Sequence, residues 1–196
     1  QVIMWIKRSG QYLAPIEAAL RKHNLPQDLK YVAVAESALR PHAGSPRGAM
    51  GFWQFIEPTG RKYGLTIDPE KDERRNLLAA TEAALVYLRE LREMFGSWTL
   101  AVAAYNMGEN GLRKEIAAQG STDYYRLYLS LETQRYLFRI LTAKMILSDP
   151  GRYGFHLRPD DIFPTRPSEA VALDIARETP LLAVAQAANT SVKIIK

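Results

Sequence analysis

The chain has 196 residues, with 26 lysines and arginines against 21 acidic residues, 47% hydrophobic residues and no cysteine. This length suits one domain with a small appendage. The lack of cysteine excludes a disulfide framework, a thiolate zinc site and a cysteine nucleophile. The three histidines lie far apart in the sequence, so we expect no metal site. Apolar runs fall short of the roughly 18 residues that a membrane span needs.

The net charge of +5 is compatible with a solvated basic surface or with an anionic partner. The basic residues are spread along the chain, in pairs such as Arg21-Lys22 and Arg113-Lys114. The sequence has no dense basic helix, no alternation of aromatic and basic residues, and no zinc-finger spacing. We therefore expect no nucleic-acid partner.

Helical patterns dominate the first 148 residues. Apolar residues recur at helical spacing over residues 2–20, where Pro15 is expected to break or restart the helix. A second helix is predicted over residues 29–39. Residues 40–52 are rich in proline, glycine and serine and predict a loop. Short helices are expected after it, from Trp53 and near Arg61.

The strongest periodic segment runs from residue 76 to residue 95 and is ended by Gly96. Its predicted buried stripe consists of Leu78, Thr81, Leu85, Leu88, Leu91 and Phe95. Three more helices are predicted, over residues 98–105, 110–118 and 133–147.

The composition changes after Pro150, where prolines and glycines become frequent. Residues 170–175 alternate like a strand, and residues 181–188 predict a short helix. We therefore predict a mainly α fold, with a helical domain over residues 1–155 and a small α/β accessory segment over 156–196.

The most unusual residue is Glu36, because it lies in an apolar helical segment. Helical spacing places it on the same side as Val32, Ala33 and Leu39. Burial disfavours the charged form of a carboxyl group and raises its pKa. Such a group stays protonated near neutral pH and can act as a general acid. The alternative is an ordinary glutamate that reaches solvent at a helix edge.

Three further patterns accompany Glu36. The segment from Gly48 to Gln54 places two glycines and aromatic residues before an amide, which suits close approach of backbone to a sugar ligand. Phe52 and Trp53 within it suit either a sugar platform or the core. Tyr105 and Asn106 precede a helix-ending glycine, and Glu132 places a second carboxylate near Tyr128 and Tyr136.

Taken in order, these motifs resemble the lytic transglycosylases with the soluble-lytic-transglycosylase fold, which are relatives of goose-type lysozyme. The resemblance rests on Glu36-Ser37, Ser45, the segment 48–54, Ala104-Tyr105-Asn106-Met107-Gly108 and Glu132-Thr133. It is closest to the membrane-bound murein transglycosylase D type and covers about residues 10–150. It implies a lysozyme-like helical catalytic domain.

The resemblance also implies an activity: cleavage of the β-1,4 bond between N-acetylmuramic acid and N-acetylglucosamine in peptidoglycan. Glu36 would act first as general acid and then as base, giving 1,6-anhydromuramic acid ends without cofactor or metal. Ser45 and Gln54 would hydrogen-bond the sugar and its substituents, and Tyr105 would hold the acetamido group or Glu36 in place. Glu132 would support the site electrostatically, and Asn106 would bind substrate, cap its turn or contact Tyr105.

The resemblance further implies a location and partners. The expected partner is the peptidoglycan glycan strand, in the periplasm or cell envelope. The protein is expected to be a monomer, with membrane anchoring through an N-terminal region outside this sequence. Residues 156–196 resemble a segment that leads towards glycan-binding LysM modules, or they brace the catalytic domain.

Two alternatives keep the same residues but change the outcome. A goose-type lysozyme-like hydrolase would use water in place of the muramic acid C6 hydroxyl. A non-catalytic glycan-binding module would bind the strand without cutting it, although a pure binder gains nothing from an acid on an apolar face.

Overall fold

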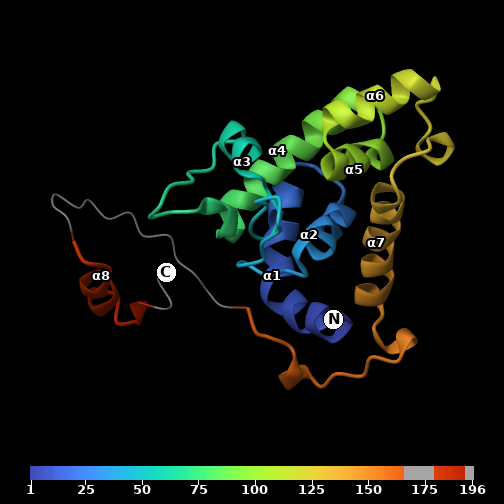
Figure 1. Ribbon diagram of the computed structural model, residues 1–196. Coiled ribbons are helices and arrows are strands. Elements are labelled where there is room, and N and C mark those ends of the chain that lie inside the picture. The colour runs from blue at the N-terminus through green and yellow to red at the C-terminus, as the bar shows by residue number, and fades with distance from the viewer. Residues whose placement is uncertain (166–178, 193–196) are drawn as a thin grey trace. The chain divides into compact units, whose positions relative to one another are not determined.

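The computed structural model describes residues 1–165 and 179–192. Contacts divide the chain into two units, Gln1–Thr165 and Arg166–Lys196. The helices of the first unit, drawn in Figure 1, are α1 (Val2–Lys22), α2 (Lys30–Ser37), α3 (Glu57–Lys62), α4 (Leu77–Phe95), α5 (Trp98–Met107), α6 (Glu109–Gln119) and α7 (Leu131–Ser148). The second unit contributes α8 (Leu181–Ala187) to the described residues. Short 3-10 turns are η1 (Gln27–Leu29), η2 (Glu73–Arg75), η3 (Tyr124–Arg126), η4 (Gly151–Tyr153) and η5 (Pro159–Asp161).

The first helix does not stop at its proline. Pro15 lies inside α1, so the predicted break is wrong. Apolar side chains on both sides of it, Leu13 and Ile16, are buried in the core. This tertiary packing offsets the lost backbone hydrogen bond, which is why the helix continues.

The loop after α2 is confirmed, but the short helix predicted from Trp53 is absent. Ala38 and Leu39 have positive φ angles of 54° and 57°, which end α2 and turn the chain. Gln54 also has a positive φ, and Phe55 forms an isolated bridge with Met50. A left-handed residue followed by an extended pairing is incompatible with a helix there.

The helices from residue 76 onward follow the sequence prediction closely. The Asn76 side chain accepts a hydrogen bond from the Ala79 amide and begins α4, and Gly96 ends it in the left-handed conformation. Most of the predicted stripe is buried or partly buried, but Leu78 is 56% exposed because it lies on the outward side of the first turn. Gly108 joins α5 to α6, as expected.

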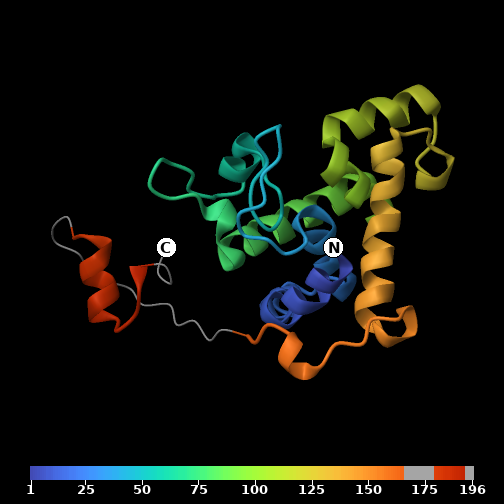
Figure 2. The ribbon, with the colours of Figure 1, turned by 60° about the horizontal axis from the view of Figure 1, so that its bottom comes forward.

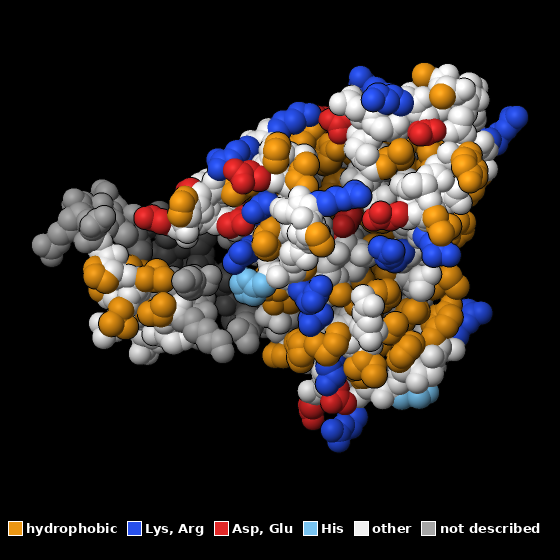
Figure 3. Space-filling model, in the orientation of Figure 1, with side chains coloured by type: hydrophobic (Ala, Val, Ile, Leu, Met, Phe, Trp, Pro, Cys, Tyr) orange, Lys and Arg blue, Asp and Glu red, His pale blue; other side chains and the backbone are white. Residues whose placement is uncertain are grey.

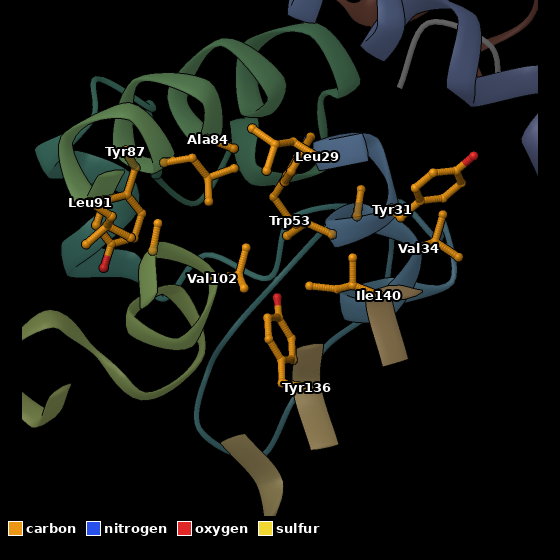
Figure 4. Close-up of a cluster of buried hydrophobic side chains, with 14 of the residues drawn as sticks. Leu29, Tyr31, Val34, Trp53, Ala84, Tyr87, Leu91, Val102, Tyr136 and Ile140 are labelled. Carbon is orange, nitrogen blue, oxygen red and sulfur yellow. The ribbon is translucent and has the colours of Figure 1, made fainter. Parts of the chain in front are cut away.

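The first unit is organised around α2 and α5. In it α2 packs between α1 and α7, whereas α5 contacts α4, α6 and α7. Figures 1 and 2 show α7 along one edge of the helical unit, beside α2. The close-up in Figure 4 shows Trp53, Val102 and Ile140 meeting in the core, with the ring of Tyr136 pointing into the same cluster. The end of α2 therefore faces α7 across buried side chains.

The chain after α7 returns to the first helix. The Phe163 amide donates to the Lys7 carbonyl oxygen, and the Thr165 hydroxyl donates to the Gly10 carbonyl oxygen, each at 2.9 Å. A Cβ atom on Gly10 would lie 2.3 Å from the Ile162 side chain, so the close contact requires glycine. Residues 156–165, which the sequence analysis grouped with the accessory segment, thus contact α1.

The accessory segment is only partly described. The predicted helix over 181–188 is confirmed as α8, whereas the strand predicted over 170–175 lies outside the described residues. Among the residues that the structure describes, no helix is both long and apolar enough to cross a membrane.

Candidate active site

Glu36 lies one residue before the end of α2, facing α7. The Tyr136 hydroxyl donates a hydrogen bond to its carboxylate Oε1 at 2.5 Å. Burial of the carboxyl raises the pKa of Glu36 from its ordinary value to about 7. The hydrogen bond from Tyr136 and the charge of Arg139 oppose this rise, and the charge of Glu132 adds to it. Burial exceeds the opposing effects, so the acid form persists to neutral pH.

The apolar packing of α2 explains this burial. Val32 and Ala33 have no exposed surface, and Ser37 is 2% exposed. The Ser37 hydroxyl bonds to the Ala33 and Phe52 carbonyl oxygens, so it fixes the helix end against the following loop. Glu36 itself is only partly exposed, so its carboxyl lies against these apolar residues while part of the side chain still reaches solvent.

Three side chains of α7 act on Glu36. Glu132, Tyr136 and Arg139 are spaced four and three residues apart, so they share one face of the helix. Glu132 is exposed in the first turn, but it is near enough to influence the Glu36 carboxyl. The sequence analysis singled out Glu132 and missed Tyr136 and Arg139 as partners of Glu36. The helical spacing from Glu132 is the signal that could have found them.

Tyr105 lies beside Glu36 but bonds elsewhere. Its hydroxyl donates to the Trp53 carbonyl oxygen at 2.8 Å, and its ring contacts Phe55 and Tyr87. Burial and the charge of Glu36 raise the pKa of Tyr105 well above its ordinary value. Tyr105 therefore remains a neutral donor. The resemblance left open whether Tyr105 holds Glu36 in place; the side chain that bonds to the Glu36 carboxyl is Tyr136.

Asn106 joins two helices. Its side-chain oxygen accepts a hydrogen bond from the Thr133 hydroxyl at 2.9 Å, and Thr133 is 1% exposed. The contact ties the end of α5 to the first turn of α7. It therefore fixes the helix that carries Tyr136.

Ser45 and Gln54 both stabilise the loop between α2 and α3. The Ser45 hydroxyl accepts a hydrogen bond from the Ala49 amide at 3.1 Å. The Gln54 side-chain nitrogen donates to the Ala43 and Gly51 carbonyl oxygens, each at 2.9 Å. Both side chains are partly exposed, and their roles as sugar ligands stay predictions.

The glycine-rich segment packs against the protein itself. A Cβ atom on Gly51 would lie 1.7 Å from the Arg74 carbonyl oxygen, so its close approach is to backbone, and the ligand-approach interpretation is wrong for this glycine. Gly48 has open space around its Cβ position. Phe52 and Trp53 are buried, and the Trp53 indole donates to the Thr81 hydroxyl, so both belong to the core.

Over residues 1–165 and 179–192, no group of three or more histidine, aspartate and glutamate side chains is arranged to hold a metal ion. The Glu36 carboxyl, with its raised pKa and its tyrosine, arginine and glutamate neighbours, suits proton transfer.

Solved structures identify the class of fold. The Escherichia coli 70 kDa soluble lytic transglycosylase superposes with a TM-score of 0.60 at 21% identity, covering 73% of this chain and 24% of that one. An inactive mutant of the lytic transglycosylase Slt from Pseudomonas aeruginosa gives a TM-score of 0.56 at 21% identity, covering 71% and 24%. The fold is thus the mainly α, lysozyme-like fold of these proteins, as predicted.

Residues 14–128 match the Transglycosylase SLT domain, so the chain belongs to this family. The membrane-bound lytic murein transglycosylase D of Escherichia coli strain K12 is 38% identical over 195 residues. That alignment covers 96% of this chain but 42% of the relative, so the chain spans less than half of that protein's length. The family resemblance seen in the motifs is confirmed.

Proposed function

We propose that this protein is a peptidoglycan lytic transglycosylase, which cleaves the β-1,4 bond between N-acetylmuramic acid and N-acetylglucosamine. Its membership of the SLT family supports the proposal, as does its similarity to a relative named as a lytic murein transglycosylase. The observation that carries it is the partly exposed Glu36 carboxyl on an apolar helix, with a pKa of about 7 and a hydrogen bond from Tyr136.

The first step needs an acid that is protonated where the enzyme works. A carboxyl with a pKa near 7 holds its proton in a substantial fraction of molecules at neutral pH. Glu36 donates this proton to the glycosidic oxygen as the bond to the anomeric carbon breaks. The acetamido group of the muramic acid assists at that carbon.

The second step needs the same group as a base. Glu36, now ionised, removes the proton of the muramic acid C6 hydroxyl, and that oxygen attacks the anomeric carbon. The product is a 1,6-anhydro ring, no water is consumed, and Glu36 regains its proton. The hydrogen bond from the Tyr136 hydroxyl favours the carboxylate, so it stabilises the ionised Glu36 that the first step forms and the second step consumes.

The other side chains act around this carboxyl. We assign Ser45 and Gln54 to the sugar substituents, since both are partly exposed in the loop that follows α2. Tyr105 is partly exposed next to Glu36, and because its proton is given to the Trp53 carbonyl oxygen, we assign its hydroxyl oxygen as an acceptor for the acetamido N–H. Glu132 supplies negative charge towards the reacting carbon, and Asn106 positions α7 through Thr133.

The substrate determines the location. Peptidoglycan lies in the periplasm or cell envelope, and a relative of this chain is named as membrane-bound. We therefore assign the protein to that compartment, with glycan strands as its partner. A monomeric state and an N-terminal membrane anchor stay predictions.

Mass spectrometry of digested peptidoglycan tests the proposal. Purified sacculi are incubated with the wild type, with Glu36→Gln and with Glu93→Gln, a matched control on the exposed side of α4. The wild type and the control should release muropeptides one water lighter than hydrolysis products. Glu36→Gln should lose at least about 100-fold in rate, the lower end of the effect of a general acid or base.

The other results have distinct meanings. Products that carry the added water would overturn the transglycosylase step and identify a lysozyme-like hydrolase. Strand binding without any product, from the wild type as from Glu36→Gln, would identify a glycan-binding module. Full activity of Glu36→Gln would remove Glu36 from the reaction.

A further inference from the structure

A pocket that contains two arginines lies in the first unit, between α1 and the turn that follows α2. Its volume is about 320 Å³. Its lining includes Arg8, Tyr12, Arg40, His42 and Phe163. Two guanidinium groups from distant parts of the sequence therefore meet in one concave site.

Neither arginine has an anionic partner among the side chains that the structure describes. Arg8 Nη1 donates to the Ala38 carbonyl oxygen, and Arg40 Nε donates to the Ser37 carbonyl oxygen, each at 3.1 Å. Each guanidinium carries five N–H donors, so several remain for a ligand. The ten ion pairs of residues 1–165 and 179–192 include neither residue.

The two cations also repel each other. Burial and the charge of Arg40 lower the pKa of Arg8. A bound anion would remove this repulsion and would pair with both groups. On the face drawn in Figure 3, several lysine and arginine side chains lie next to acidic ones.

Specific backbone features build the pocket. The left-handed residues Ala38 and Leu39 turn the chain so that Arg40 meets α1. Phe163 forms an opposite wall, held by the hydrogen bond from its amide to Lys7 and by the close contact at Gly10. The pocket is therefore part of the folded unit and not a chance meeting of surface side chains.

We propose that Arg8 and Arg40 bind a carboxylate of the peptide stems that peptidoglycan carries on its muramic acid residues. This inference rests on the proposed function. A planar guanidinium pairs with a carboxylate through two parallel hydrogen bonds, which favours this anion. Arg40 follows Glu36 by four residues, across the left-handed turn at Ala38 and Leu39, so the stem site and the proposed catalytic carboxyl are close in the chain. The site makes the enzyme prefer glycan strands that retain their stems.

The test compares two substrates for each variant. One is peptidoglycan glycan with intact stems, and the other is the same glycan after an amidase has removed them. The variants are Arg8→Gln, Arg40→Gln and the double variant, with Arg21→Gln, an exposed arginine at the end of α1, as the matched control.

We expect the double variant to lose about tenfold or more in kcat/KM on stem-bearing glycan, in line with hydrogen bonds to charged groups. Its kcat/KM on stem-free glycan should equal that of the wild type, which also shows that it folds. Arg21→Gln should match the wild type on both substrates. Equal losses on both substrates, or no loss on either, would overturn the proposal.

A binding measurement separates this proposal from the proposed function. The wild type and the double variant are titrated by NMR with a synthetic stem peptide bearing free carboxylates, with its fully amidated form, and with inorganic phosphate. Shifts at Arg8 and Arg40 with the free peptide alone support the site, even if the protein cuts no glycan. Shifts with phosphate but not with the peptide identify a general anion site, and equal shifts with the amidated peptide exclude carboxylate recognition. Either result overturns the proposal.

Discussion

Two ionisable side chains of this protein differ in the partners that surround their charged groups. Arg74 is 7% exposed and has its charge fully paired: its guanidinium donates twice to the Asp72 carboxylate and once each to the Gly48 and Phe55 carbonyl oxygens. Glu36 is held in an apolar helix with one neutral donor, Tyr136, on its carboxyl.

This difference shows why one charged group stabilises the fold whereas the other is suited to proton transfer. Arg74 connects η2 to both ends of the loop segment 48–55, and its ion pair lowers the pKa of Asp72. Both of these groups stay charged and fix the loop. Glu36 lacks such a partner, so burial raises its pKa into the neutral range. A buried group that is left unpaired can exchange a proton, whereas a paired one cannot.

The largest effect is expected from breaking the paired site. Arg74→Met removes the guanidinium and leaves the Asp72 carboxylate and two loop carbonyl oxygens without their main donor. Losing one partner of a buried ion pair typically costs about 3–5 kcal/mol of the free energy of unfolding. Urea denaturation at pH 7 measures this loss.

The neighbouring arginine provides the matched control. Arg75 lies 3.8 Å from the same Asp72 carboxylate, but its side chain is 45% exposed. Arg75→Met should cost less than about 1 kcal/mol, as exposed ion pairs do. Equal losses for the two variants would mean that burial does not decide the strength of these contacts.

The next prediction concerns Glu36, where a substitution should raise the free energy of unfolding instead of lowering it. The pKa of Glu36 is about 7 in the folded protein and 4.5 ordinarily, a difference worth about 3 kcal/mol. Between pH 4.5 and pH 7 the Glu36 carboxyl is therefore protonated more fully in the folded state than in the unfolded state. The free energy of unfolding consequently falls as the pH rises through this range. Glu36→Gln cannot ionise, so it should be more stable than the wild type above pH 7, by up to about 3 kcal/mol.

This advantage should vanish at low pH. Below pH 4.5 the carboxyl is protonated in both states, and glutamine resembles it closely. Urea denaturation from pH 4 to pH 8 measures the difference, with Glu93→Gln as a control that should show no such trend. A difference that stays constant with pH would mean that Glu36 titrates normally.

The sequence predicted the helices better than it predicted the loop. Periodicity and end signals located α4, α5, α6 and α7, since Asn76, Gly96 and Gly108 mark their limits locally. It failed at Pro15 and at Trp53. In both places contacts with distant residues override a local preference: burial on each side of Pro15 and the packing of Gly51 on Arg74.

In the candidate site, too, the features set by neighbouring residues were predictable from the sequence, and those set by distant residues were not. Glu36 was visible from the sequence because its apolar neighbours lie within its own helix. Tyr136 lies 100 residues away, and only the packing of α2 on α7 shows that it bonds to Glu36. Arg8 and Arg40 are likewise far apart in the sequence, and only the turn at Ala38 and Leu39 shows that they line one pocket.

The smallest effect tests the single donor on Glu36. Tyr136→Phe keeps the buried ring and removes the hydroxyl, so the carboxylate loses the hydrogen bond that favours it. The pKa of Glu36 should rise further, by about one unit if the bond contributes about 1.5 kcal/mol. NMR of the carboxyl carbon in glutamate labelled with ¹³C measures it directly. Tyr105→Phe is the control, because its hydroxyl bonds to the Trp53 carbonyl oxygen. If Tyr105→Phe raises the pKa of Glu36 as much as Tyr136→Phe does, the hydrogen bond is not the cause. The general polarity of the site would then set the pKa of Glu36. Its difference from Arg74 would in that case come from the surroundings of the carboxyl and not from its single hydrogen-bond donor.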